Sequence, residues 1–87
     1  MSNQEFIDKC KQVVLDYTKE HMDKSDGEMD SPIDVYVVWA CKTLQNHKAL
    51  LSTNVRDGMY YELTYNGDKQ QLYLDAYKKF ENRCIQM

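Results

Sequence analysis

The dipeptide Asp57-Gly58 constrains the fold of this chain most strongly, because segments with the alternating pattern of β-strands flank it. Glycine accepts the positive φ angle that a tight hairpin turn requires, and Asp-Gly is a strong hairpin signal. We therefore predict antiparallel strands over residues 48–55 and 59–65. Alternate residues of the second strand would face the core, namely Met59, Tyr61, Leu63 and Tyr65. Its other face would carry Tyr60, Glu62 and Thr64.

The amino-terminal segment has the periodicity of an amphipathic helix. Its apolar residues recur three or four positions apart and are Phe6, Cys10, Val13, Val14 and Tyr17. Ser2 and Glu5 match a capping box, which satisfies free backbone amides at the start of a helix. We predict a helix over residues 3–23, followed by an acidic loop over residues 24–31.

The segment over residues 32–45 carries conflicting signals. Its Val-Tyr-Val-Val-Trp run is β-branched and aromatic, which favours a strand. Ser31, Pro32 and Asp34 instead match the start of a helix. The apolar residues that recur at helical spacing are Val37, Val38, Cys41 and Leu44. We predict a helix over residues 32–45, and a strand over residues 34–41 stays the alternative.

The carboxyl-terminal segment follows the period of a helix over most of its length. The positions that match are Leu72, Tyr73, Ala76, Tyr77, Phe80, Cys84 and Ile85. Asp68 and Gln71 would cap such a helix, whereas Leu74 does not fit its apolar face. We predict a helix over residues 68–85, with a strand over residues 70–77 as the alternative.

The predicted element order is α-α-β-β-α in a single small α+β domain over residues 1–87. Helices would pack on one face of a short antiparallel hairpin. A lone hairpin leaves two unpaired strand edges, and a chain of 87 residues buries only a small core. Association with a second copy would relieve both problems, so we expect a homodimer.

Composition disfavours several functional classes. The net charge of −3 argues against nucleic-acid binding, which needs clustered lysine and arginine. The three cysteines lie far apart and form no disulfide framework, as expected of reduced thiols in a cytosol. No apolar run approaches the roughly 20 residues that a membrane helix needs, and no signal peptide is evident.

The sequence also predicts no metal, no cofactor and no enzymatic activity. His21 and His47 lie far apart and belong to no ligand motif. Cys41 lies in an apolar segment without a histidine base beside it, which is typical of a structural thiol. The three glycines are isolated and form no phosphate-binding loop.

Two surfaces are candidates for binding. The first is the outer face of the hairpin, where Arg56 would flank Tyr60, Glu62 and Thr64. The second is the acidic loop together with the aspartate that precedes it. The carboxylates of this surface belong to Asp23, Asp26, Glu28 and Asp30. A solvated loop is the simpler explanation for these acids. Trp39 would lie on a second apolar edge of the central helix, where burial and an interface role are both open.

Two long runs carry a family resemblance. "DVYVVWACKTLQNHKALLST" and "DGMYYELTYNGDKQQLYLDAYKKFEN" resemble small proteins encoded by phages and prophages of low-GC Gram-positive bacteria. The similarity covers nearly the whole chain and is strongest from Val35 to Asn82. Those proteins form an uncharacterised family, so the resemblance implies an origin and supplies no catalytic or ligand residues.

A phage origin and the lack of enzymatic motifs lead to our first functional hypothesis. We expect a non-enzymatic binding protein of the host cytoplasm that engages or inhibits a host or bacterial-defence protein. A second hypothesis is a protein that sequesters a nucleotide signal at a dimer interface, with Arg56 or Arg83 on the phosphate and tyrosines on the base. Direct nucleic-acid binding is the third, and the acidic balance disfavours it.

Overall fold

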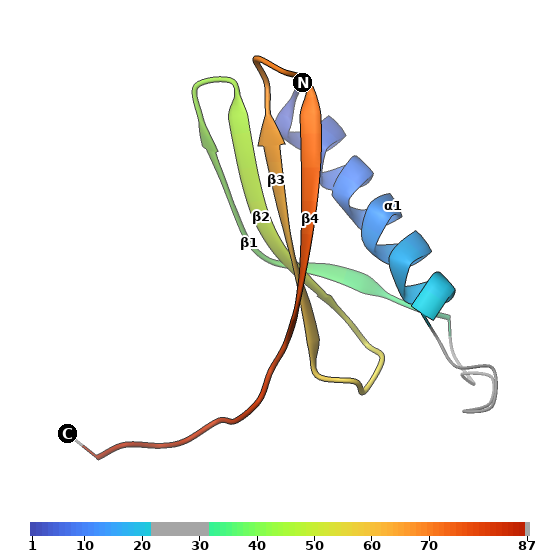
Figure 1. The fold of residues 1–87 in the computed structure, drawn as a ribbon, viewed down its shortest axis with the longest axis vertical. Helices are drawn as coiled ribbons and strands as arrows, with labels where there is room; N and C mark the ends of the chain where they lie inside the picture. The colour runs from blue at the N-terminus through green and yellow to red at the C-terminus, as the bar shows by residue number, and fades with distance from the viewer. Residues whose placement is uncertain (22–31, 87) are drawn as a thin grey trace.

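A computed structural model describes residues 1–21 and 32–86 of the chain, and Figure 1 shows its fold. Its elements are α1 (Asn3–His21), β1 (Val35–Thr43), β2 (Asn46–Thr53), β3 (Met59–Asn66) and β4 (Gln71–Lys78). The strands form one antiparallel sheet in the order β1-β2-β3-β4, so each strand pairs with the next one in the chain. The predicted order α-α-β-β-α with a two-stranded hairpin is therefore wrong.

Helix α1 lies where the amino-terminal helix was expected. The Oγ of Ser2 accepts a hydrogen bond from the backbone N–H of Glu5 at 3.1 Å, as in a capping box. The end of the predicted helix over residues 3–23 and the predicted acidic loop over residues 24–31 lie partly or wholly outside the described residues. Strands β2 and β3 occupy the segments that flank Asp57-Gly58, and Gly58 has a φ of 70°.

The predicted helix over residues 32–45 is instead strand β1, which pairs with β2. The β-branched and aromatic run prevailed over the capping signals because β2 offers it a ladder of backbone hydrogen bonds. The register shifts between Val37 and Trp39, as at a β-bulge. A bulge adds one residue and interrupts the period of two. The apolar residues at helical spacing do not share one face, because Val37 packs against the core whereas Cys41 and Leu44 are exposed.

The predicted helix over residues 68–85 is also wrong. A turn over residues 67–70 leads into β4, and residues 79–86 continue as an extended tail. In β4 the residues Leu72 and Leu74 alternate with exposed ones, and Leu74 pairs with the buried Leu63 of β3. Leu74, which did not fit the helical period, is thus the residue that carried the strand signal.

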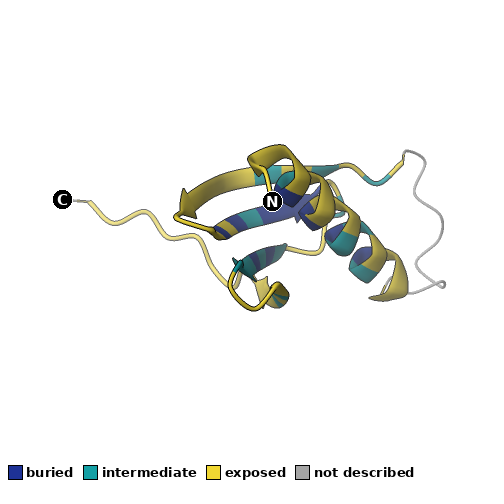
Figure 2. Ribbon diagram, turned by 90° about the horizontal axis from the view of Figure 1, so that it is seen from above, coloured by how far each residue is buried: buried dark blue, intermediate teal, exposed yellow. Residues whose placement is uncertain are grey.

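The core lies between α1 and one face of the sheet, as Figure 2 shows. Its fully buried members are Phe6, Cys10, Val14, Ala49, Leu51, Tyr61 and Leu63. Helix α1 lies against β1 and β2.

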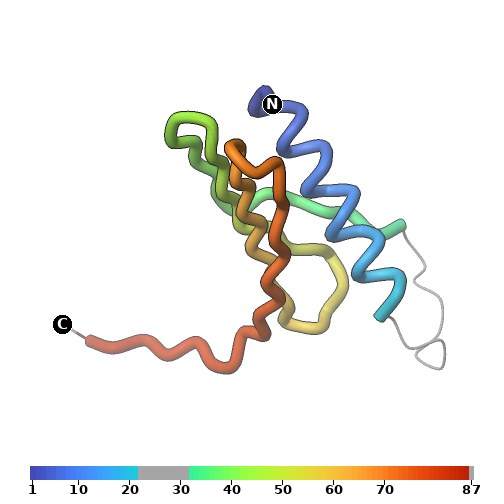
Figure 3. Tube along the Cα trace, turned by 45° about the horizontal axis from the view of Figure 1, so that its top comes forward, coloured from blue at the N-terminus to red at the C-terminus, as the bar shows by residue number. Residues whose placement is uncertain are grey.

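Burial raises the pKa of the Cys10 thiol to about 12, and burial also raises the pKa of Tyr61. In the described parts of the chain, no helix lies against the opposite face of the sheet. Figure 3 shows the same arrangement from another angle.

Candidate functional site: the open face of the sheet

Strand register places side chains from all four strands together on the face turned away from α1. Cross-strand partners share a face, and this face alternates with the buried residues of β2 and β3. The first row across the sheet is Tyr36, Ser52, Tyr60 and Tyr77. The second row is Trp39, Leu50, Glu62 and Asp75. The third row is Cys41, Lys48, Thr64 and Tyr73. We call these twelve residues the open face.

Aromatic side chains dominate the exposed part of the open face. The exposed fractions are 42% for Trp39, 46% for Tyr36, 52% for Tyr77 and 54% for Tyr73. Tyrosine and tryptophan are enriched at interfaces because they bury much area with few rotamers to immobilise. The open face therefore has the composition of a binding surface.

Two carboxylates lie in the second row of the open face, Glu62 on the inner strand β3 and Asp75 on the edge strand β4. Glu62 of β3 and Asp75 of β4 are direct cross-strand partners, and like charges in that relation repel each other. The Nζ of Lys48 lies 3.3 Å from a carboxylate oxygen of Glu62, so one of the two charges is compensated. No lysine or arginine of the described chain forms an ion pair with Asp75. Asp75 thus leaves a negative charge between Tyr73 and Tyr77 on the same strand.

The structure brings together four of the predicted site residues. Tyr60, Glu62 and Thr64 lie on the open face, and Trp39 joins them from β1 although it was expected on a helix. Arg56 lies in the turn between β2 and β3 and does not belong to this face. The four acids of the second candidate surface, Asp23, Asp26, Glu28 and Asp30, lie outside the described residues.

Sequence reasoning missed the contribution of β4. Tyr73 and Tyr77 were expected on the apolar face of a helix, and both are exposed. The signal that could have found them is the alternation of Tyr73, Asp75 and Tyr77 with the apolar residues between them.

The histidines take part in packing. The His47 ring is buried and stacks on Phe6 with ring centroids 4.7 Å apart, and its Nε2 lies 3.3 Å from the backbone oxygen of Met1. His21 stacks on Tyr17 at 4.0 Å. Within residues 1–21 and 32–86, no group of three or more histidine, cysteine or acidic side chains could hold a metal ion. In the same residues, no helix has the length and apolar character that spanning a membrane requires.

Comparison with known proteins identified one family. A family model described as "Family of unknown function (DUF6275)" matches residues 7–87, which include α1 from Ile7 onward, all four strands and the extended tail. No curated protein and no solved structure matches the chain. The comparisons therefore assign the chain to a family but do not indicate an activity.

Proposed function

The chain belongs to the DUF6275 family of unknown function, and from that premise we propose that it is a small, phage-encoded, non-enzymatic binding protein. It engages a host or bacterial-defence protein in the host cytoplasm through the open face. The observation that carries this proposal is the set of exposed aromatic side chains on both edge strands, on a sheet face that no helix of the described residues covers. The phage origin rests on the sequence resemblance described above.

The charges on the open face indicate the chemistry of the partner. Asp75 and Glu62 place two negative charges in the second row of the open face. Lys48 is the one cation of this face and compensates Glu62. A lysine or arginine of a partner would compensate Asp75 and lie against the neighbouring tyrosine rings, where cation–π attraction adds to the ion pair. We therefore propose a partner segment that presents a basic side chain among apolar ones.

The same charges weigh against the two alternative functions. A nucleotide or a nucleic acid brings phosphates, which require free lysine or arginine. On the open face the one cation, Lys48, is already paired with Glu62. A protein partner with a basic segment fits the surface better than either phosphate-bearing ligand.

A pull-down from host lysate, read by mass spectrometry, tests the proposal. The Tyr73→Ser/Tyr77→Ser double variant removes two exposed aromatic rings from the open face, and Asp75→Lys reverses the charge at this position. Phe80→Ser is the control, because Phe80 is also an exposed aromatic residue but lies outside the open face. We expect a specific partner with the wild type and with Phe80→Ser, and its loss with both open-face changes. A partner retained by every variant, or no specific partner, would contradict the proposal.

A further inference from the structure

The extended tail over residues 79–86, which we call the arm, exposes apolar side chains that contact no core. Phe80 is 98% exposed and Ile85 is 72% exposed. The N–H of Lys79 donates a hydrogen bond to the backbone oxygen of Gly58, and no backbone hydrogen bond ties the remaining arm residues to other described parts of the chain. Figure 1 shows the arm running away from the sheet. The family match includes the arm, so it is part of the family's common sequence.

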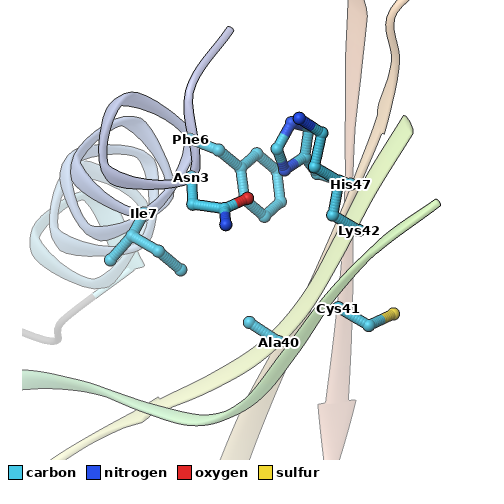
Figure 4. A pocket seen from close by; sticks show the side chains of 7 residues that line it. All are labelled: Asn3, Phe6, Ile7, Ala40, Cys41, Lys42 and His47. Carbon is cyan, nitrogen blue, oxygen red and sulfur yellow. The ribbon is translucent and has the colours of Figure 1, made fainter. Parts of the chain in front are cut away.

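A cavity opens between the first turns of α1 and strand β1. Its volume is about 220 Å³, and it is lined by Asn3, Phe6, Ile7, Ala40, Cys41, Lys42 and His47. Figure 4 shows Asn3, Phe6 and Ile7 projecting from α1 toward β1, with the Cys41 sulfur turned away. An apolar cavity of about 150 Å³ is large enough to hold benzene, so this one can accept a phenyl ring.

The cavity lies beside an unpaired strand edge. Strand β1 is at one end of the sheet and, among residues 1–21 and 32–86, pairs only with β2. Unpaired edges recruit extended segments by strand addition, in which backbone hydrogen bonds give affinity and side-chain pockets give specificity. The bulge disrupts the first half of β1, but the register is regular from Trp39 to Thr43, alongside the cavity.

We propose that the arm of one copy adds to this half of β1 in a second copy and inserts Phe80 into the cavity. The arm is already extended, and it carries the exposed aromatic side chain that the cavity can hold. Exchange of both arms would give a closed two-fold dimer, in which each subunit supplies one arm and one edge. The self-association expected from the sequence thereby gains a defined interface, and this interface does not depend on the proposed function of the open face.

The arm cannot reach the cavity of its own subunit. Strand β4 is at the opposite end of the sheet from β1, about 14 Å away at three strand spacings. The arm leaves β4 beside Met59, near the turn between β2 and β3, whereas Lys42 and His47 lie near the turn between β1 and β2 at the other end of the strands. Phe80 follows the end of β4 by two residues, a reach of about 7 Å. A second copy is therefore the occupant that the geometry allows.

Sedimentation equilibrium of the purified full chain from micromolar to submillimolar concentration tests the arm exchange. We expect a dimer for the wild type. Phe80→Ser should weaken the dimer about tenfold or more, the scale for loss of a buried aromatic anchor. Ala40→Phe, which fills the cavity at an exposed position, should weaken it similarly without altering the arm. The control Tyr73→Ser/Tyr77→Ser should leave the dimer constant unchanged.

Three outcomes would overturn the inference. The first is a wild type that stays monomeric over the whole concentration range. The second is a dimer that Phe80→Ser weakens but Ala40→Phe does not, since the cavity would then not hold the ring. The third is a dimer lost with the open-face control, which would assign self-association to the open face.

Discussion

The two faces of the sheet use similar residue types for different ends. On the covered face, Leu51, Tyr61 and Leu63 are almost fully buried beneath α1. On the open face, Tyr36, Trp39, Tyr73 and Tyr77 remain about half exposed, although three of them are tyrosines like the buried Tyr61. A single helix of 19 residues is narrower than a four-stranded sheet and can cover only one side of it. Aromatic content alone therefore does not indicate the core; position relative to the one helix does.

The largest difference between the two faces should appear in stability. Leu63→Ala removes a side chain with no exposed surface and should lower the free energy of unfolding by about 2–5 kcal/mol. Tyr73→Ser on the open face should lower it by about 0.5 kcal/mol or less, since surface changes are usually that small. Urea titrations at 25 °C measure both values. Similar losses for the two variants would mean that both faces are buried.

The covered face should also make stability depend on alkaline pH. The pKa of Cys10 rises from 9.0 to about 12 because burial disfavours the thiolate. The folded state therefore keeps a proton that the unfolded state has lost, and stability falls as the pH rises from 9 to 12. The slope should be at most about 1.4 kcal/mol for each pH unit from this group. Urea titrations at pH 8, 9 and 10 measure it.

Cys10→Ala separates this thiol from other alkaline groups. The variant should show a shallower loss of stability above pH 9, and the remaining loss would come from groups such as Tyr61, whose pKa burial also raises. If the dependence of stability on pH is the same in Cys10→Ala as in the wild type, the thiol is not buried between α1 and the sheet.

The smallest effect on stability should come from the charges of the open face. Here we expect the free energy of unfolding to rise rather than fall. Asp75→Asn removes one of two facing carboxylates and should raise the free energy of unfolding by about 0.2–1 kcal/mol. The same change should weaken binding of a basic partner. Thr64→Asn, at a neighbouring position of the face, is a control without a charge change. A loss of stability in Asp75→Asn would indicate that another cation compensates this carboxylate.

The sequence predicted the central strands and not the edge strands. In β3, after Asp57-Gly58, the buried Tyr61 and Leu63 alternate with less buried residues, so Tyr60, Glu62 and Thr64 could be placed on the outer side. In β1 the bulge after Val37 disguised the strand. In β4 the spacing of Tyr73 and Tyr77 also fits a helix, and only pairing with β3 shows that they are exposed. Such pairing depends on residues distant in the chain.

The most direct test of the central claim, that one face of the sheet is covered and the other is open, is thiol labelling of the native Cys84→Ser variant. This variant keeps one thiol on each side: Cys10 of α1 is buried against the covered face, and Cys41 is exposed on the open face. We expect one thiol to react with an aromatic disulfide reagent at the rate of an exposed cysteine, and the second to react only after unfolding. Protection of both thiols, or rapid labelling of both, would contradict the account.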